Sequence, residues 1–388
     1  MQLTQKQQEG LEIAVQRYKD RKAYTCIAGY AGAGKSTLVK FIVEALQIPQ
    51  SDVCYIAYTG KAALVLKEKG CPNSMTAHRL LYKSFPRRDG TFYHMPKRPL
   101  DYPYKLIVLD EVSMFPKEMW ELLLSHGIHI IALGDPGQLP PIGDDNGILA
   151  QPHVFLDEIM RQAQESEIIR LTMDIRAGKP LQLFKGNEVQ IIDKSELVDG
   201  MLLWADQIIC AKNETRRNIN QLIRQYKYGA DVGFAPVNGD KVICLRNDWD
   251  RPNLNGDVMV NGMIGTITNI QYGRPNQWLE TDLIADVIPD GYEEDDMFAS
   301  FDELHIDYKL LTSGEPTVNK KNFKRFPPVI KPKEFDYGYC ITAWKAQGSE
   351  YDKVLVFEED FPFDKDTHTR FLYTAATRAK KKLVLVRR

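Results

Sequence analysis

Short apolar runs alternate with amphipathic segments along the first third of the chain. Between two of these runs, the segment that begins at Thr37 has apolar residues at positions 38, 41, 42 and 45, which is the spacing of one helix face. The segment that begins at Lys61, KAALVLKEK, has a similar pattern. Strands that alternate with helices predict an α/β fold with a parallel sheet. The four runs expected to be buried strands are 24–28 (YTCIA), 53–57 (VCYIA), 105–109 (KLIVL) and 128–133 (IHIIAL).

The segment 84–104, SFPRRDGTFYHMPKRPLDYPY, interrupts this alternation. It contains several prolines, aromatic residues and an Asp89-Gly90 pair, which is a strong turn signal. We therefore expect a small projecting hairpin here.

A second α/β stretch is predicted from about residue 161. A helix should end within 173–178, where Gly178 and Pro180 stop it, and residues 202–211 are expected to add a strand. Residues 234–332 consist of short alternating segments with turn signals, which predicts a small all-β unit such as a barrel. Apolar strand-like runs return after residue 332, so the β unit is predicted to be inserted into the second α/β domain.

Composition narrows the class of protein. A chain of 388 residues with 44% hydrophobic residues is too long for a single small module and too apolar to be disordered. It contains no apolar run long enough to span a membrane, and its N-terminus is too polar for a signal peptide, so we expect a cytoplasmic protein. The six cysteines form no C-x-x-C pair, which favours reduced, mostly buried thiols and predicts no structural metal.

The charges nearly cancel, with 50 basic and 52 acidic residues, but they are segregated along the chain. Residues 290–303 are acidic, whereas 320–333 and 378–388 are basic. Taken alone, each of these segments is expected to be solvated surface.

The strongest local signal is the segment from Gly29 to Ser36, GYAGAGKS, which lies between a predicted strand and a predicted helix. It matches the phosphate-binding loop G-x-x-x-x-G-K-[ST] in the required context. Its glycines let backbone N–H groups surround a phosphate, Lys35 reaches the β and γ phosphates, and Ser36 binds Mg²⁺. The alternative, a glycine-rich turn that binds nothing, is disfavoured by this context.

A second signal is the acid pair Asp110 and Glu111 at the end of the apolar run LIVL. Asp110 is expected to hold the Mg²⁺ shell, and Glu111 to orient and deprotonate the attacking water. The alternative is an acid pair that caps a helix after a strand. One carboxylate facing the metal beside one facing water favours hydrolysis over phosphoryl transfer to a small molecule.

The fourth predicted strand is followed by Gly134-Asp135-Pro136-Gly137-Gln138. A polar Asp and Gln beside the phosphates suit a sensor of the γ-phosphate, although G-D-P-G alone is typical of a tight turn. His126 and His129 have helix-like spacing but lack a cysteine or carboxylate cluster, so we predict no metal site there.

Taken together, these motifs resemble those of the superfamily 1 helicases, and the resemblance extends over nearly the whole chain. Further matches are LTQKQ at 3–7, TGKAA at 59–63, TAHRLL at 76–81, LDEIMRQ around 161, TAWKAQGSEYDKV from 342 and LYTAATRAKK from 372. The chain leaves no room for large helical insertions in the first domain. A short hairpin there and a small β unit later resemble the RecD-like branch, in particular the compact Dda-type helicases of phages.

The resemblance implies two RecA-like P-loop motor domains. The first comprises 1–83 and 105–160, interrupted by a pin hairpin at 84–104. The second comprises 161–233 and 333–388, interrupted by an SH3-like β-barrel at 234–332.

The resemblance also implies roles for residues at the nucleotide. Gln7 would recognise adenine, although Thr4-x-x-Gln7 is also the signature of a helix capping box. Arg161 and Arg378 would reach the γ-phosphate from across a cleft. The implied catalytic set is Lys35, Glu111, Gln138, Arg161 and Arg378; the nucleotide-binding set is Gln7, Gly32, Ala33, Gly34, Lys35, Ser36, Thr37, Gly348 and Glu350; and the metal ligands are Ser36 and Asp110.

A further group of residues is implied to contact the nucleic acid, namely Tyr58, Thr59, Thr76, His78, Thr342 and Trp344, with Phe85, Phe92 and Tyr93 in the pin. Tyr58 and Trp344 depart from the family pattern of Pro and His. These two aromatic side chains either stack on a base or sugar, or face the core. The pin aromatics either stack on the fork or pack against the inserted β unit.

The implied activity is that of an ATP-dependent DNA helicase that moves 5′ to 3′ on single-stranded DNA, with ATP and Mg²⁺ as cofactors. We expect a monomer that acts on single-stranded DNA and DNA forks in replication, recombination or repair of a bacterial or phage-infected cell, with a single-strand-binding or replication protein as the candidate partner. Two alternatives stay open. One is an ATPase that remodels protein–DNA or RNA complexes without separating strands, and the other is a slow nucleotide-dependent switch.

Overall fold

The computed structural model divides into two compact units. Unit 1 comprises Met1–Lys83, Pro96–Leu197 and Ala346–Arg388, and unit 2 comprises Ser84–Met95 and Val198–Lys345. The structure describes residues 3–86, 92–140, 144–159, 165–248, 253–254, 258–274, 281–292, 299–317, 332–360 and 364–387.

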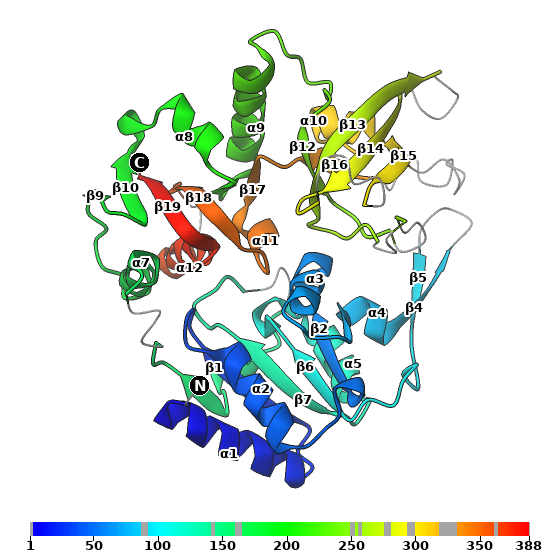
Figure 1. Cartoon of the computed structure of the whole chain (residues 1–388), viewed down its shortest axis with the longest axis vertical. Helices are drawn as coiled ribbons and strands as arrows, with labels where there is room; N and C mark the ends of the chain where they lie inside the picture. The colour runs from blue at the N-terminus through cyan, green and yellow to red at the C-terminus, as the bar shows by residue number, and fades with distance from the viewer. Residues whose placement is uncertain are drawn as a thin grey trace. The chain divides into compact units, whose positions relative to one another are not determined.

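Unit 1 is built around a six-stranded sheet in the order β3-β2-β6-β7-β1-β8 (Figure 1). Its neighbouring strands all pair in parallel, which confirms the predicted parallel sheet. The four strands predicted from the apolar runs are β1, β2, β6 and β7. The bounds are β1 Tyr24–Gly29, β2 Val53–Ala57, β3 Ser74–Thr76, β6 Leu106–Leu109, β7 His129–Gly134 and β8 Val154–Leu156.

Helices cover both faces of this sheet. Successive residues of β2 belong to different hydrophobic clusters: Tyr55 packs with Leu38 of α2, and Ile56 packs with Trp120 of α5. Strands buried on both faces explain the continuous apolar runs in the sequence. The helices are α1 Gln5–Lys19, α2 Lys35–Ala45, α3 Gly60–Glu68, α4 Ala77–Leu81 and α5 Lys117–Leu124, with short 3₁₀ helices at Gln50–Asp52, Val112–Met114 and Ile148–Ala150.

Unit 1 also contains a second group of paired strands. Strand β19 lies between β18 and β10 and pairs in parallel with both, and β9 adds to β10 in the antiparallel direction. Helix α7 ends before Gly178, whose φ of 65° suits glycine, so the predicted helix end is confirmed. The bounds are α7 Glu167–Arg176, β9 Phe184–Lys185, β10 Val189–Asp193, β18 Tyr351–Phe357, α12 Lys365–Ala376 and β19 Ala379–Arg387, with a 3₁₀ helix at Lys194–Glu196.

Unit 2 contains a parallel pair of short strands, β11 and β17, packed against α9. The prediction of a strand over 202–211 is correct only for its second half, because residues up to Trp204 form helix α8 and the chain then turns at Ala205 and Asp206. The bounds are α8 Asp199–Trp204, β11 Gln207–Cys210, α9 Asn213–Tyr228, β17 Cys340–Thr342 and α11 Ala343–Ala346.

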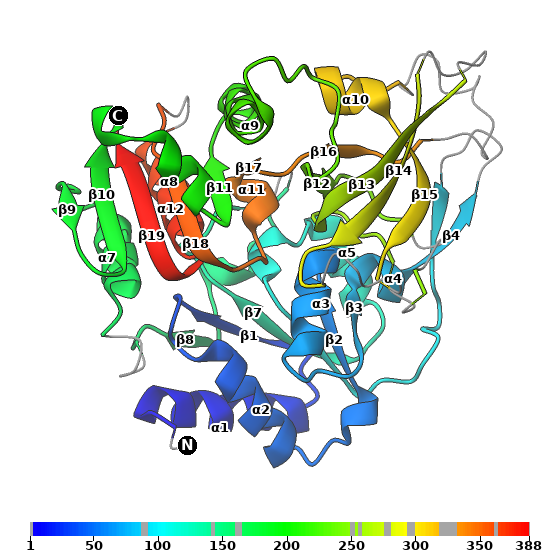
Figure 2. The same cartoon turned by 45° about the horizontal axis from the view of Figure 1, so that its top comes forward.

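A five-stranded antiparallel sheet, in the order β15-β14-β13-β12-β16, is the largest element of unit 2 (Figure 2). Strands were predicted here, but helix α10 was not, and its N-cap Asp307 accepts a hydrogen bond from the Leu310 N–H at 3.0 Å. The sheet extends past residue 332 into β16. Its SH3-like class and the domain boundaries stay predictions. The bounds are β12 Lys241–Cys244, β13 Ile264–Gly273, β14 Asp282–Pro289, β15 Phe301–Ile306, β16 Phe335–Tyr337 and α10 Tyr308–Ser313.

The residues of the predicted pin form a two-stranded sheet of β4, Tyr82–Pro86, and β5, Phe92–Pro96. The strands therefore begin just before the predicted segment 84–104 and end well inside it.

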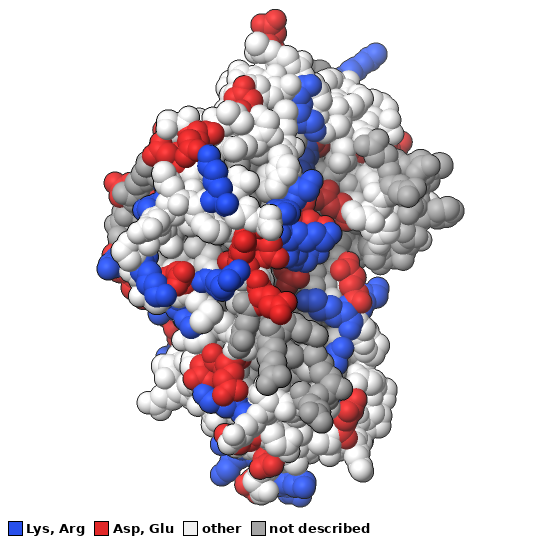
Figure 3. Space-filling view, turned by 60° about the vertical axis from the view of Figure 1, so that its left-hand side comes forward, with Lys and Arg blue, Asp and Glu red and all other residues white. Residues whose placement is uncertain are grey.

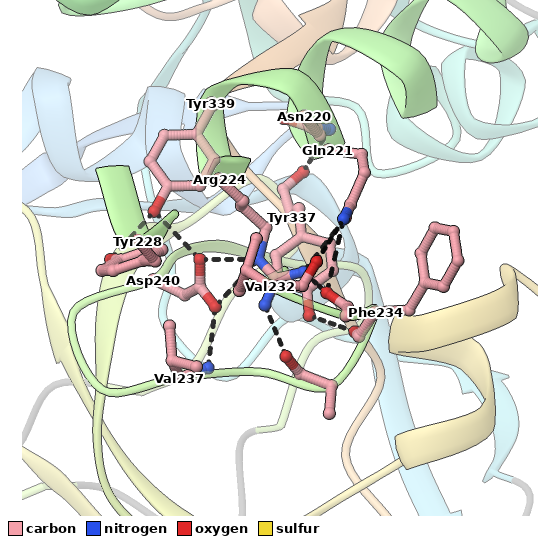
Figure 4. Close-up of polar contacts among 12 residues, drawn as sticks. Asn220, Gln221, Arg224, Tyr228, Val232, Phe234, Val237, Asp240, Tyr337 and Tyr339 are labelled. Carbon is pink, nitrogen blue, oxygen red and sulfur yellow. Dashed lines mark hydrogen bonds and ion pairs between the residues drawn. The ribbon is translucent and has the colours of Figure 1, made fainter. Parts of the chain in front are cut away.

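A buried ion pair holds α9 against the antiparallel sheet (Figure 4). Arg224 of α9 and Asp240, just before β12, have fully buried side chains, and Arg224 Nε donates to both Asp240 carboxylate oxygens at 3.0 and 3.1 Å. The Arg224 guanidinium also donates to the backbone oxygens of Gly233 and Ala235, and it lies over the Tyr337 ring at 4.3 Å. One cation thus fixes a helix, a loop and a strand.

Asp240 is satisfied by further donors. The Tyr339 hydroxyl donates to its Oδ1 at 3.0 Å, and the Val237 N–H donates to its Oδ2 at 2.9 Å. A buried ion pair is tolerated only when its remaining hydrogen-bonding groups also find partners, and here both partners have them.

We expect Arg224→Met to destabilise the protein by about 3–5 kcal/mol, because it leaves the Asp240 carboxylate buried without its cation. Unfolding by denaturant measures this change in the free energy of unfolding. Arg246 is the control, because its ion pair with Glu334 at 3.1 Å is partly exposed, and Arg246→Met should cost less than about 1 kcal/mol. Equal costs for the two variants would contradict the assigned role of the buried pair.

Candidate active site

The predicted phosphate-binding loop connects β1 to α2. Gly32 and Gly34 both have φ of 77°, a conformation that favours glycine, and Gly34 is the N-cap of α2. Lys35 Nζ donates to the backbone oxygens of Gly29 at 2.6 Å and Tyr30 at 3.2 Å, so the ammonium group is held over the loop. The loop has the local geometry that anion binding at a helix N-terminus requires.

Gln7 contacts this loop from α1. Its Nε2 donates to the Ala33 backbone oxygen at 3.3 Å, and its side chain is buried. The capping box is also present, because Gln7 Oε1 accepts from the Thr4 N–H and Thr4 Oγ1 accepts from the Gln7 N–H. The capping interpretation is therefore confirmed, and recognition of adenine by Gln7 stays a prediction.

The acid pair follows β6, as predicted. Burial and the neighbouring Glu111 carboxylate raise the pKa of Asp110 to about 6, whereas Lys35 acts to lower it. The Glu111 N–H donates to Asp110 Oδ1 at 3.0 Å. Glu111 itself has φ of 54°, which is uncommon outside glycine and is concentrated at functional sites.

Gln138 connects Glu111 to Arg378. In the amide orientation that satisfies its hydrogen bonds, Gln138 Nε2 donates to Glu111 Oε2 at 3.2 Å and its Oε1 accepts from Arg378 Nη2 at 3.3 Å. Arg378 Nη1 lies 4.0 Å from Glu111 Oε1. The structure therefore brings three of the predicted catalytic residues together.

Arg378 is held from several sides. Its Nε donates to the Thr374 backbone oxygen at 3.1 Å, its Nη1 to the Ser349 backbone oxygen at 3.3 Å, and its Nη2 to Thr377 Oγ1 at 2.9 Å. Its side chain is only 5% exposed. A guanidinium held by these three oxygens has a fixed orientation beside Glu111.

Asp135 forms the tight turn that was the alternative for G-D-P-G. Its Oδ1 accepts from the Gly137 N–H at 2.9 Å, and its backbone oxygen accepts from the Gln138 N–H at 3.2 Å. Its Oδ2 accepts from the Tyr373 hydroxyl at 2.7 Å. Burial raises the pKa of Asp135, and Lys35 acts to lower it.

The sequence analysis gave no role to Tyr373. Besides donating to Asp135, its hydroxyl accepts from the Ala31 N–H of the phosphate-binding loop at 3.0 Å. The residue lies within LYTAATRAKK, which was matched as a motif, and this was the available signal. Its position at the loop could not be read from the run itself.

A second contact at the loop was also missed. The Arg176 guanidinium of α7 lies 3.3 Å from the centroid of the Tyr30 ring, and the Phe155 ring meets Tyr30 edge-on at 5.3 Å. No sequence signal pairs these residues.

Some of the residues predicted to contact nucleic acid have structural roles. Thr59 Oγ1 caps α3 and Thr76 Oγ1 caps α4, each accepting from a backbone N–H at 3.3 Å. Tyr58 packs against the core cluster of β6 and α5, next to His78 with a ring-centroid distance of 6.0 Å, which supports the core-facing alternative.

Several other predicted residues can be placed individually. Gly348 has φ of 73°, and a Cβ there would lie 2.8 Å from Ala62 Cβ. Glu350 pairs with Lys69 at 3.8 Å.

The remaining predicted residues differ in exposure. Ser36 is exposed and Thr37 is half-buried at the start of α2, and Thr342 and Trp344 are half-buried in unit 2. Phe85 is 44% exposed. Arg161 and the side chains of Phe92 and Tyr93 lie outside the described residues.

Other groups in the described part of the chain suggest no further chemistry. His129 is buried, with Nε2 3.1 Å from Thr25 Oγ1 and Nδ1 2.7 Å from the Lys22 backbone oxygen. All six cysteines are free, and five are buried. Over the described residues, no group of three or more His, Cys, Asp and Glu is arranged to hold a metal, and no helix is long and apolar enough to cross a membrane.

We expect Arg378→Ala to lower kcat for nucleotide hydrolysis by on the order of 10²–10³-fold, because it removes a preoriented cation at Glu111. Nucleotide binding should weaken much less, which steady-state kinetics and direct binding will distinguish. Lys381→Ala, in the surface pair with Asp352, is the control. Normal hydrolysis by Arg378→Ala would exclude Arg378 from the site.

Comparison with known proteins identifies the family of the chain. A family model described as an AAA domain matches residues 2–198, and one described as a UvrD-like helicase C-terminal domain matches residues 337–386. The chain is 22% identical to the ATP-dependent DNA helicase dda of Enterobacteria phage T4 over 431 aligned positions, which cover 97% of this chain and 98% of that protein.

Solved structures show the same fold. The Pif1 helicase from Bacteroides in complex with ADP-AlF3 and ssDNA has a TM-score of 0.54 at 18% identity, covering 99% of this chain and 92% of that one. A Pif1 structure from work on DNA unwinding at forked dsDNA by two coordinating Pif1 helicases has a TM-score of 0.56 at 19% identity, with the same coverage. The AAA-domain match to more than half of the chain, together with the helicase C-terminal match and these relatives, shows that the chain belongs to the superfamily 1 helicases of the Dda and Pif1 type.

Proposed function

We propose that this protein is an ATP-dependent DNA helicase that moves 5′ to 3′ along single-stranded DNA and unwinds duplex DNA. The observation that carries the proposal is the hydrogen-bonded connection between Glu111, Gln138 and Arg378. This connection joins Glu111, which is suited to activating water, with the Arg378 cation, which is suited to binding the γ-phosphate. The residues come from distant parts of the sequence. Family membership supports the ATP-hydrolysing activity.

Hydrolysis follows from the charges at the site. Lys35 and the loop amides would bind the phosphates, and Glu111 would accept a proton from the attacking water, while Arg378 and Gln138 meet the charge that develops in the transition state. Ser36 and Asp110 are suited to hold Mg²⁺, because the buried Asp110 carboxylate is an oxygen donor with excess negative charge beside Glu111. When bound, Mg²⁺ would neutralise phosphate charge.

Binding of the single-stranded DNA is proposed to depend on local contacts between the protein and the sugar–phosphate backbone. Thr59 caps α3, and a Cβ on Gly348 would lie 3.5 Å from Thr59 Oγ1, so the start of α3 and the segment around residue 348 lie side by side. Contacts to the sugar–phosphate backbone predict weak sequence preference and strong salt dependence.

The basic C-terminal segment contributes little to this binding. Lys380 and Lys381 pair with Asp352 at 3.6 and 2.6 Å, and Arg387 pairs with Glu358 at 2.9 Å. On the face that Figure 3 draws, Lys and Arg side chains lie among Asp and Glu side chains. The sequence interpretation of this segment as solvated surface is therefore preferred to a nucleic-acid contact.

The direction of movement rests on resemblance to the RecD-like branch. The Dda relative is named as a DNA helicase, and the Pif1 relatives are described with ssDNA and forked dsDNA. Single-stranded DNA and forks are accordingly the proposed substrates, with a monomer as the proposed active form.

We expect single-stranded DNA to stimulate ATP hydrolysis and a partial duplex with a 5′ tail to be unwound. Unwinding of 5′-tailed and 3′-tailed substrates is compared under single-turnover conditions. Lys35→Ala should abolish both activities and keep most strand binding, because it removes charge only at the phosphates. Unwinding from the 3′ tail alone would contradict the polarity, and ATP hydrolysis without stimulation or unwinding would favour a nucleotide-dependent switch.

The two-stranded sheet of β4 and β5 is proposed to act as the pin that splits the duplex. Replacing residues 84–95 by a Gly-Ser turn should remove unwinding and keep DNA-stimulated ATP hydrolysis, because separation and movement would use different surfaces. Phe85, 44% exposed, is the described aromatic that could stack on a base, worth about 1–3 kcal/mol. Phe85→Ala should slow unwinding while Phe85→Trp should not. Full unwinding by the hairpin-less variant would rule out this role.

A further inference from the structure

The Tyr373 hydroxyl is placed between two parts of the nucleotide site. It accepts a hydrogen bond from the Ala31 N–H of the phosphate-binding loop at 3.0 Å and donates one to Asp135 Oδ2 at 2.7 Å. Both distances are those of well-formed hydrogen bonds. Tyr373 belongs to α12, whereas its two partners follow β1 and β7, so one oxygen atom connects three elements.

The position of the Tyr373 ring is fixed by packing. Its side chain is 1% exposed, and a Cβ atom on Gly137 would lie 3.0 Å from its Cε1. The Tyr373 ring therefore occupies space that any larger residue at position 137 would fill, and its burial beside the turn holds the hydroxyl at Ala31 and Asp135. A side chain with so little freedom loses little conformational entropy when it makes its hydrogen bonds.

The contact to Ala31 determines which loop amides remain for a ligand. The Ala31 N–H is committed to Tyr373, and the Ala33 N–H donates to the Tyr30 backbone oxygen at 3.2 Å. Among the loop amides, these two are therefore directed at protein oxygens. Tyr373 thus sets the plane of the peptide that begins the phosphate-binding turn.

The second hydrogen bond of the Tyr373 hydroxyl, to Asp135, acts on the turn that follows β7. Asp135 is 1% exposed, and its two carboxylate oxygens accept from Gly137 and Tyr373. A donated hydrogen bond favours the ionised form of a buried carboxylate, and an ionised Asp135 attracts the Lys35 ammonium group. Loss of the Tyr373 hydroxyl would alter both the loop backbone and this attraction.

We propose that Tyr373 is a positioning residue for ATP hydrolysis, and that its hydroxyl holds the phosphate-binding loop and Asp135 in register so that the site is assembled for the chemical step. The proposal rests on the proposed ATP hydrolysis at this site. Tyr373 does not itself contact the reacting atoms, and it acts through Ala31 and Asp135.

The test compares Tyr373→Phe with the wild type in ATP hydrolysis at saturating single-stranded DNA. The variant keeps the ring and removes both hydrogen bonds. We expect kcat to fall at least about tenfold, while KM for ATP changes by less than about threefold, since the interaction matters for the assembled site more than for ground-state binding. Tyr55→Phe is the matched control, because Tyr55 is also a buried tyrosine of unit 1 and its hydroxyl donates to Gln50 Oε1 at 3.1 Å. It should have the activity of the wild type.

A second comparison tests the connection to Asp135. In the Asp135→Ala background, Tyr373→Phe should lower kcat much less than it does in the wild type, because one of its two partners is already gone. An undiminished effect in that background would show that Tyr373 does not act through Asp135 and would overturn the proposal. The proposal would also be overturned by a Tyr373→Phe variant with wild-type kcat, or by one in which only KM rises.

If Tyr373→Phe does not fold, as thermal unfolding would reveal, Gly137→Ala provides the test. Its added Cβ would lie 3.0 Å from Tyr373 Cε1 and 3.2 Å from Asp135 Oδ1, so the ring and the carboxylate must shift slightly apart while the hydroxyl is kept. A folded Gly137→Ala variant should show a lowered kcat at similar KM, and wild-type kcat would overturn the proposal. Absence of ATP hydrolysis by the wild type would instead contradict the proposed function, so the two failures are distinguishable.

Discussion

The nucleotide site depends on the parallel register of three neighbouring strands. Ala28 of β1 lies opposite Gly134 of β7, and Leu109 of β6 lies opposite Ala132. The segments that leave these strands therefore begin at nearly the same level of one sheet edge. Because of this, the phosphate-binding loop, the acid pair and the turn at Asp135 meet without any long-range adjustment, and a register change in one strand would separate them.

The same edge gathers negative charge in a buried setting. Asp110, Glu111 and Asp135 come close to one another, and burial makes each uncompensated carboxylate costly. Lys35 and Arg378 supply the opposing charge. The neutral side chain of Gln138 carries hydrogen bonds between Glu111 and Arg378, and the neutral Tyr373 hydroxyl donates to Asp135, so that these carboxylates gain partners without a further ion.

The parts of the site that could be predicted from the sequence are those that lie within short motifs, including Gln138 and Arg378. The loop Gly29–Ser36 and the acid pair can be recognised in the sequence because their chemistry needs fixed spacing after a strand. Tyr373 and Gly137 could not be found in this way, since their contact joins residues that are adjacent only in the folded chain. Among the elements, the parallel strands were predicted from their apolar runs. Helices α8 and α10 were missed, because they are short and lie between strand-like segments.

The turn after β7 shows how the site is tied to the C-terminal segments. The Leu139 N–H donates to Thr374 Oγ1 at 2.9 Å, and the Leu139 backbone oxygen accepts from Gln347 Nε2 at 3.1 Å. Arg370 Nη1 donates to the Pro136 backbone oxygen at 3.0 Å. Buried backbone groups must find partners, and here those partners are the side chains of Gln347 and of two residues in α12, the helix just before Arg378. A displacement of α12 would therefore break hydrogen bonds to the turn that carries Gln138 and would move Arg378 with them, so the geometry around Glu111 depends on the position of α12.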